Sequence, residues 1–157
     1  MSRHLTGWVF VAVQGVLLGA LILLPGRDDW ATPSLLRGAG YGFILAGLAV
    51  IAIASLRLGS ALTPTPVPTS RGVLATTGLY RWVRHPIYTG VLAIVAGLTV
   101  RSGSVVHLAV AVITVVFFVV KAKWEEARLA ERYPDYAAYA AITPRFVPRP
   151  RRRSPVG

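Results

Sequence analysis

The sequence has 157 residues, of which 54% are hydrophobic and 15% charged, and its mean hydropathy is +0.58. Soluble domains carry roughly 25% charged residues, so this composition argues against a soluble domain and favours a bundle of membrane-spanning helices. The absence of cysteine excludes disulfides, cysteine metal sites and thiol catalysis. Three histidines without metal-ligand spacing imply no metal. The formal net charge is +11, but the basic residues flank apolar blocks, so no nucleic-acid partner is expected.

The first apolar block, Thr6–Leu24, is about as long as a bilayer-spanning helix, which needs roughly 20 residues. A secretory signal peptide is the alternative, because Arg3 and His4 precede the block. No small-residue cleavage site precedes the turn at residues 25–29, so we expect a retained first span that ends at Pro25.

The second apolar block, Leu35–Leu58, predicts a second span, with Ser34 as its N-cap. Small residues recur at helical spacing in this block and predict that another helix approaches closely. They are Gly38, Gly42, Ala46 and Gly47. Residues 59–85 then break the apolar pattern, and three prolines between positions 63 and 69 exclude a helix there.

The third apolar block, Ile87–Val100, is short for a span, so we expect it to borrow residues 80–86 at its base or to lie in a thinned or tilted region. A tight turn at Arg101–Ser104 leads to the fourth block, Val105–Val120, which continues as a polar helix to Arg132. The sequence therefore predicts an all-α integral membrane bundle of about four transmembrane helices that ends in a helical hairpin.

The basic residues predict the orientation of this bundle. With the N-terminus inside, 14 of the 17 Lys and Arg residues fall on the inner side, and Arg27, Arg37 and Arg101 fall on the outer side. Basic residues accumulate on the cytoplasmic side of membrane proteins, so we expect a multi-pass protein of the cell (inner) membrane with both termini cytoplasmic.

Two polar stretches could carry chemistry on the inner side. In the first, Arg84, His85 and two tyrosines surround Pro86, which suits the first position of a helix. Unpaired N–H groups at that helix start, together with Arg84 and His85, would form an anion-binding corner. The alternative is an interfacial anchor, with aromatic and cationic side chains at the level of the lipid headgroups.

In the second stretch, Glu125 and Glu126 are adjacent on one helix, so one carboxylate must point toward the bundle or the interface. Glu125 shares a face with Lys121, and buried acids near a membrane are often functional. The alternative is a surface ladder of Glu with Lys or Arg. A short amphipathic turn, Asp135–Ala140, follows, within a tyrosine stripe typical of packing in a lid or an interfacial face: Tyr133, Tyr136 and Tyr139.

Together these residues resemble the superfamily of isoprenylcysteine carboxyl methyltransferases and phospholipid methyltransferases. That family shows Gly-x-Tyr, then Arg-His-Pro-x-Tyr at a helix start, Glu-Glu-x-x-Leu, Tyr-x-x-Tyr and Arg-Phe-x-Pro. The corresponding elements occur in the same order within residues 71–148: Gly78-Leu79-Tyr80, Arg84-His85-Pro86-Ile87-Tyr88, Glu125-Glu126-Ala127-Arg128-Leu129, Tyr136-Ala137-Ala138-Tyr139 and Arg145-Phe146-Val147-Pro148.

The resemblance implies S-adenosylmethionine as the cofactor, bound between the last helical hairpin and a cytoplasmic C-terminal segment. It assigns catalytic roles to Lys121 and Glu125. Cofactor contacts carry over to Gly72, Val73, Leu74, Ala75, Tyr80, Arg84, His85, Pro86, Ile87, Tyr88 and Glu125. The eukaryotic isoprenylcysteine enzymes have arginine in place of Lys121, and an ammonium lacks the bidentate fork of arginine, so this departure weighs against a prenylcysteine carboxylate as the substrate.

The expected organisation is one membrane methyltransferase domain over residues 1–157. It contains two N-terminal spans in 1–60, a cofactor-binding catalytic core in 61–148 and a mobile basic tail in 149–157. The expected function is S-adenosylmethionine-dependent methyl transfer to a lipid or small apolar acceptor at the cytoplasmic membrane face. The acceptor stays open among an isoprenylcysteine-like carboxylate, a phospholipid amine, a thiol and a quinone-like lipid. The alternatives are a nicotinamide-dependent enzyme like the membrane sterol reductases, and a non-catalytic scaffold that binds anionic lipid.

Overall fold

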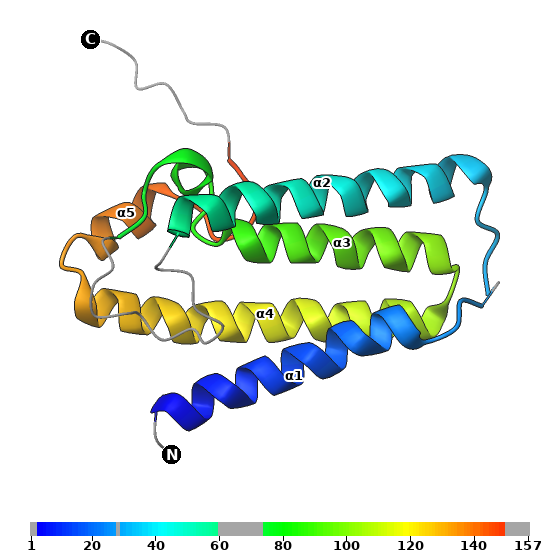
Figure 1. The fold of residues 1–157 in the computed structure, drawn as a ribbon, viewed down its shortest axis with the longest axis horizontal. Coiled ribbons are helices and arrows are strands. Elements are labelled where there is room, and N and C mark those ends of the chain that lie inside the picture. Colours follow the sequence, from blue (N-terminus) through cyan, green and yellow to red (C-terminus); the bar gives the residue numbers. More distant parts are fainter. Residues whose placement is uncertain (1–2, 28, 60–73, 150–157) are drawn as a thin grey trace, which may run out of the picture.

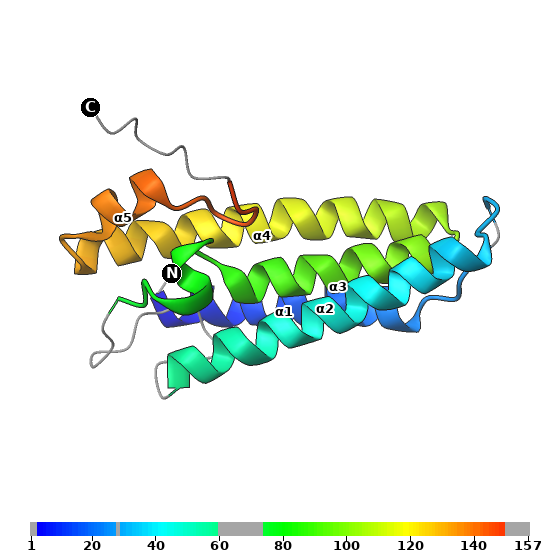
Figure 2. The same ribbon diagram turned by 90° about the horizontal axis from the view of Figure 1, so that it is seen from above.

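The computed structural model describes residues 3–27, 29–59 and 74–149. These residues form helices and no strand, which confirms the expected all-α fold. Figure 1 shows four long helices that run antiparallel to their neighbours in the chain: α1 (Arg3–Leu23), α2 (Ser34–Leu58), α3 (Pro86–Ser102) and α4 (Val105–Arg132). Two short helices lie together at one end of the bundle, as Figure 2 also shows: the 3-10 helix η2 (Gly78–Arg81) and α5 (Tyr136–Ile142).

The long helices have the character of membrane spans. Helices α1, α2 and α4 are each long and apolar enough to cross a membrane, and α3 is a shorter apolar helix of 17 residues. Large apolar side chains cover their outer faces, for example Val16, Leu45 and Val116. A contiguous apolar surface of this kind is unfavourable in water and favourable in lipid, so the chain is a membrane protein.

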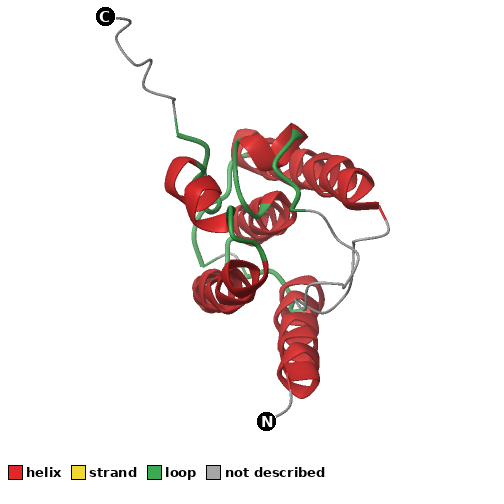
Figure 3. Cartoon of the chain, turned by 90° about the vertical axis from the view of Figure 1, so that its left-hand side faces the viewer, coloured by secondary structure: helices red, strands yellow, loops and turns green. Residues whose placement is uncertain are grey.

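Helix α3 lies at the centre of the bundle, because it contacts each of the other three long helices. Figure 3 shows the four helices in cross-section, with α1 at the edge beside the N label. A small apolar core forms where α1, α3 and α4 meet, around Leu21, Val95 and Ala111. Among the described residues, the main neighbours of α2 are α3 and η2. The bundle therefore depends on α3 to hold its parts together.

Helices α2 and α3 approach each other backbone to backbone along two pairs of glycines. A Cβ atom added to Gly47 would lie 2.5 Å from the carbonyl oxygen of Gly90, and one added to Gly97 would lie 2.5 Å from the carbonyl oxygen of Gly40. The two pairs are seven residues apart on each helix, which keeps them on one face. We call these four residues the glycine seam.

The glycine seam confirms that another helix approaches α2 closely, but three of the four residues expected to make this contact were wrong. Gly38 and Gly42 have nothing within 4 Å of an added Cβ, and Ala46 is exposed. The contact uses Gly47 together with Gly40, which lies seven residues earlier. Small residues occur on more than one face of α2. The face that makes the contact is determined by how α3 packs against α2.

Several helix boundaries differ from those expected; α1, for example, runs Arg3–Leu23 where Thr6–Leu24 was expected. Ser34 is already helical, and Pro33 occupies the N-cap position of α2. Helix α3 continues to Ser102, so the expected turn is shorter and begins at Gly103, whose positive φ of 57° terminates the helix. The helix begins at Pro86, as expected, but of the residues 80–86 it includes only Pro86, because residues 78–81 form the separate helix η2 and residues 82–85 are not α-helical.

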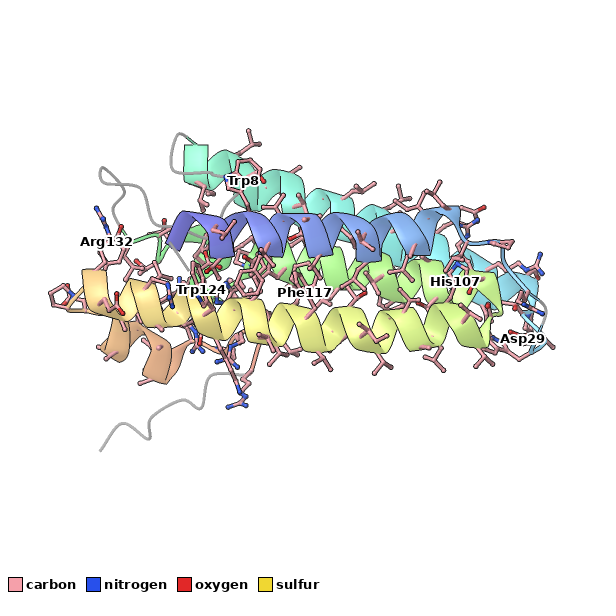
Figure 4. The ribbon with its side chains drawn as sticks, turned by 90° about the horizontal axis from the view of Figure 1, so that it is seen from below. Trp8, Asp29, His107, Phe117, Trp124 and Arg132 are labelled. Atoms are coloured by element: carbon pink, nitrogen blue, oxygen red, sulfur yellow. The ribbon has the colours of Figure 1, made fainter. Side chains whose placement is uncertain are left out.

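Helix α4 is continuous through its apolar and polar parts, as expected. Its start is capped by Asp29, whose Oδ2 accepts a hydrogen bond of 2.9 Å from the N–H of Val105. Figure 4 labels Asp29 at this end and Arg132 at the other. Helix α5 begins one residue later and ends two residues later than the expected turn. The proline-rich stretch at 63–69 and the tail from residue 150 onward lie outside the described residues.

Candidate functional site

The polar motifs of the sequence meet at one end of the bundle. The start of α3, the last third of α4, helices η2 and α5, and the segment 143–149 lie together there (Figures 1 and 2). The N–H of Arg84 donates to the carbonyl of Pro144 at 2.9 Å, and the N–H of His85 donates to the carbonyl of Arg145 at 3.1 Å. These two hydrogen bonds tie the C-terminal segment to the residues that precede α3.

Glu126 is the most highly connected carboxylate at this end. Arg145 donates from Nε to Oε1 at 2.8 Å and from a terminal nitrogen to Oε2 at 2.6 Å, a bidentate pair. Arg84 donates to Oε1 from two nitrogens, at 3.2 and 3.0 Å. Nε2 of His85 lies 3.0 Å from the same oxygen. These contacts satisfy both oxygens of a side chain that is only 13% exposed. We call Glu126, Arg145, Arg84 and His85 the Glu126 cluster.

The Glu126 cluster occupies the corner where the sequence suggested an anion site. The anion that Arg84 and His85 contact in the structure is Glu126 itself. The remaining terminal nitrogen of Arg84 donates to the carbonyls of Ala140 and Thr143, at 2.8 and 2.6 Å. Arg84 therefore cross-links α4 to the end of α5, as well as contributing to the cluster.

Sequence reasoning chose Glu125 of the adjacent pair and missed the role of Glu126. A signal for it was present, because the buried residues Phe118 and Ala122 precede Glu126 at spacings of eight and four on α4. Glu125 follows the buried residue Lys121 by four positions, so it also faces the buried side of α4. Both carboxylates thus lie on the buried side of the helix, so the surface ladder of Glu with Lys or Arg is excluded for this pair.

Glu125 lies beside the aromatic side chains at the start of α3. The hydroxyl of Tyr88 donates to Oε2 of Glu125 at 2.9 Å, and Nδ1 of His85 lies 3.6 Å from the same oxygen. The rings of His85 and Tyr88 stack with their centres 5.2 Å apart and their planes parallel. The side chain of Glu125 is 24% exposed, about twice as exposed as Glu126, so it keeps more access to a ligand.

Three tyrosines lie on the two short helices at the polar end of the bundle. Tyr139 donates its hydroxyl to the carbonyl of Tyr80 at 2.6 Å and so fastens α5 to η2. The hydroxyl of Tyr136 is buried and has no hydrogen-bond partner among the described residues. Burial raises the pKa of Tyr139 to about 12, and burial followed by nearby carboxylates raises the pKa of Tyr80 and of Tyr136. All three hydroxyls therefore stay protonated at neutral pH and can act as donors.

Lys121 contacts a residue that the sequence did not single out. It is 3% exposed, and its ammonium donates to Oε1 of Gln14 on α1 at 2.5 Å. The ring of Tyr88 lies 5.1 Å from the ammonium. Gln14 is an amide within an apolar span, which is itself a signal, because polar groups in spans are costly and often functional.

Aromatic side chains fill the space between α1 and α4 near this lysine. Figure 4 shows Trp124 and Phe117 between the two helices. The ring of Phe10 on α1 lies 5.4 Å from Trp124 and 5.9 Å from Phe117. These contacts pack the first half of α1 against the middle of α4.

The remaining expected cofactor residues have less specific surroundings. Leu74 and Ala75 are partly buried and lead into η2; Pro86 is buried and Ile87 partly buried at the start of α3. Gly72 and Val73 lie outside the described residues. No group of three or more His, Asp or Glu side chains within the described residues could hold a metal ion.

Comparisons with known proteins find similar sequences. The family model described as phospholipid methyltransferase matches residues 36–136, more than half of the chain. Over 152 residues the chain is 31% identical to the cobalt-zinc-cadmium resistance protein CzcN of Cupriavidus metallidurans, and 28% identical to the nickel-cobalt-cadmium resistance protein NccN of Alcaligenes xylosoxydans xylosoxydans. Each alignment covers 95% of this chain, and it covers 66% of the first relative and 67% of the second.

The chain thus spans about two thirds of the length of the curated relatives it matches. The range matched by the family model extends from α2 to the first residue of α5 and contains His85, Lys121, Glu125 and Glu126. The expected resemblance is confirmed by this match. The chain belongs to the phospholipid methyltransferase family, within the superfamily of membrane methyltransferases that includes the isoprenylcysteine carboxyl methyltransferases.

Proposed function

We propose that the chain transfers a methyl group from S-adenosylmethionine to a lipid or small apolar acceptor at the cytoplasmic membrane face. One observation carries the proposal: Glu125, Tyr88 and His85 converge from two helices at the polar end of an apolar bundle. The proposed acceptor enters from the lipid beside the helices, and the proposed cofactor enters from water at the polar end.

The residues present fit a cationic cofactor with polar groups. Bound S-adenosylmethionine would supply an electrophilic methyl carbon on a sulfonium, so no covalent nucleophile is needed from the protein. Glu125 offers a carboxylate, and Tyr88 and Tyr80 offer aromatic faces, which attract such a cation. The buried hydroxyl of Tyr136 has no partner among the described residues and suits a polar group of the ligand.

The Glu126 cluster has a supporting role in this proposal. His85 contacts both carboxylates, with Nε2 toward Glu126 and Nδ1 toward Glu125. Its stacked ring orients Tyr88. Arg84 and Arg145 hold Glu126 in place. The chain's own groups thus position Glu125 and Tyr88, which favours catalysis by orientation.

Replacing Glu125 with glutamine tests cofactor binding directly. Glutamine keeps the shape of the side chain and removes the charge that would face the sulfonium. Losing one charge-assisted contact costs about 1.5–3 kcal/mol, so we expect the affinity for S-adenosylmethionine to fall about tenfold or more. Isothermal titration calorimetry on the purified protein in lipid nanodiscs measures this change.

A matched control lies on the same helix. Glu131 is exposed, and Glu131→Gln removes the same charge at a distance from the proposed site, so its affinity for S-adenosylmethionine should equal that of the parent. Equal affinity in Glu125→Gln and Glu131→Gln would contradict the proposed role of Glu125. Binding of a nicotinamide dinucleotide in place of S-adenosylmethionine would support the reductase alternative, and binding of neither would support the scaffold.

The proposed location requires a particular orientation in the membrane. Helix α1 begins, and α5 ends, at the end of the bundle that holds the site (Figure 1). The basic residues of the sequence predict that this end is cytoplasmic. Reporter fusions after Gly26 and Gly103 should be active outside the cytoplasm, and fusions at Thr69 and Gly157 should be active inside it. Extracytoplasmic activity of the Gly157 fusion would place the site away from the cellular cofactor pool.

The relatives suggest a physiological setting for this chemistry. Both are named as resistance proteins for divalent metal ions. We propose that methyl transfer by this chain serves the same kind of resistance, through modification of a membrane lipid or a small thiol.

A further inference from the structure

Gln14 carries the single carboxamide side chain of the sequence, which contains no asparagine and no second glutamine. It lies near the middle of the apolar helix α1, where a polar side chain is costly without a partner. Its partner is the ammonium of Lys121, which donates to Oε1 at 2.5 Å. Helix α1 precedes residue 36, where the match to the family model begins. It therefore adds to the site a contact that the matched part of the chain does not contain.

The packing of α1 directs Gln14 toward α4. Phe10, four residues earlier on α1, packs against Trp124 of α4. Leu18, four residues later, packs against the apolar core where α1, α3 and α4 meet. Residues four apart lie on one face of a helix, so the contacts on either side hold Gln14 on the face that meets α4.

Two acceptors compete for the buried ammonium of Lys121. Glu125 lies one turn further along the same face of α4, and its charge stabilises the ammonium electrostatically. The two side chains nevertheless form no direct ion pair in the structure. The ammonium donates to Gln14, and Oε2 of Glu125 accepts from the hydroxyl of Tyr88. The amide on α1 thus holds the ammonium where the carboxylate on α4 does not contact it.

A direct pair would change what Glu125 can do. An ammonium and a carboxylate four residues apart on one helix attract each other, and the attraction is stronger in a medium of low dielectric. Once paired, the carboxylate of Glu125 would present little net charge to a third group. A bound sulfonium would lose its counter-charge, so the separation of Lys121 from Glu125 matters for a cationic cofactor.

We infer that Gln14 is a positioning residue: by holding the ammonium of Lys121 toward α1, it keeps the carboxylate of Glu125 free for the sulfonium of the cofactor. This inference rests on the proposed function and deepens it. Gln14 acts through Lys121 and not by touching the cofactor. An amide suits this task, because it accepts a hydrogen bond without adding a charge inside the span.

The separation of the two charges can be measured without cofactor. The sequence contains two lysines, so a Lys123→Arg background leaves Lys121 as the only one. Solid-state NMR in nanodiscs, with labelled nitrogen on lysine and labelled carbon on the glutamate carboxylates, then reports whether Nζ of Lys121 contacts a carboxylate. We expect no direct pair in this background and a direct pair once Gln14→Met removes the amide. A pair that is already present before this change, or is absent after it, would overturn the inference.

Cofactor binding provides the second arm of the test. Gln14→Met should lower the affinity for S-adenosylmethionine about tenfold, the loss of one charge-assisted contact, as measured by calorimetry in nanodiscs. Adding Lys121→Met should restore the affinity, because no ammonium remains to pair with Glu125. If Gln14 only supports the fold, the double variant binds as weakly as Gln14→Met. Binding is measured in place of turnover, because Lys121 has an expected catalytic role.

Three further variants make the binding test specific. Val16→Met places the same new side chain at a lipid-facing position of α1 and should bind the cofactor like the parent. Gln14→Glu keeps an acceptor for Lys121 and should bind it no more weakly than the parent does. Lys121→Met alone leaves α1 unchanged and should also bind it no more weakly. Weaker binding by Lys121→Met would show that the ammonium supports Glu125, which contradicts the inference even where the Gln14 variants fail to fold.

Failure of this inference and failure of the proposed function give different results. Normal cofactor affinity in the parent together with equal affinity in Gln14→Met would rule out only the role of Gln14. Absence of S-adenosylmethionine binding in the parent would contradict the proposed function itself, and the NMR contact would still decide whether Gln14 separates Lys121 from Glu125.

Discussion

Replacing Glu126 with glutamine is expected to release segment 143–149 from α4 and to lower the free energy of unfolding by about 3–5 kcal/mol, the cost of removing one partner from a buried ion pair. Both oxygens of Glu126 accept hydrogen bonds from cationic side chains, and Arg145 and Arg84 would be left uncompensated. Thermal and chemical unfolding in mixed micelles measures the loss of stability. Limited proteolysis should cut the C-terminal segment of the variant much earlier than that of the parent.

Glu131→Gln is the matched control for this prediction, because it removes an exposed carboxylate from the same helix. It should change the free energy of unfolding by less than about 1 kcal/mol, because an exposed carboxylate contributes little even where it has a partner. A double variant, Glu126→Gln with Arg145→Gln, should lose less stability than the sum of the single changes, since the two side chains interact directly. Resistance to proteolysis equal to that of the parent would show that the Glu126 cluster does not hold the segment.

Replacing Gly47 with alanine is expected to force α2 away from α3. The added Cβ would lie 2.5 Å from the carbonyl oxygen of Gly90. Because the obstacle is backbone, it cannot move aside as the end of a flexible side chain can. Overpacking of this kind costs about 1–3 kcal/mol, and Gly47→Leu should cost more. Unfolding in mixed micelles measures the loss, and crosslinking between α2 and α3 reports their separation.

Gly42→Ala provides the opposite expectation on the same helix. No atom lies within 4 Å of a Cβ at this position, and alanine is more favourable than glycine inside a helix by about 1 kcal/mol in water. The variant should therefore be as stable as the parent or slightly more stable. A similar loss in Gly42→Ala and Gly47→Ala would show that glycine acts through helix flexibility and not through close contact.

The helices were predictable because each depends on a local pattern. The apolar blocks are continuous stretches of sequence. The signals that end and start helices, Pro25 and Pro86, act within one helical turn. The boundary errors were small and occurred where two local signals competed. Ser34 is a good N-cap residue, but the preceding proline takes that position.

The proximity of the motif residues was predictable, whereas the partners of Glu126 and Lys121 were not. His85, Tyr88 and Glu125 do lie together, as the motifs indicated. Glu126 is bound by Arg145, which lies 19 residues away along the chain. Gln14 contacts Lys121, which lies 107 residues away. No local pattern reports a pairing of that range, because it is set by how the helices pack.

The length of α3 has a consequence for where the reaction would take place. Its 17 residues span about 26 Å, less than the roughly 30 Å of a bilayer's hydrocarbon core. A short turn joins α3 to α4, so Lys121 lies at about the level of Pro86. In a bilayer spanned by α3, both residues would therefore lie within the hydrocarbon core or at one edge of it. An acceptor would keep its chain in the leaflet during the reaction and search for the site by two-dimensional diffusion, and turnover would depend on the thickness of the surrounding bilayer.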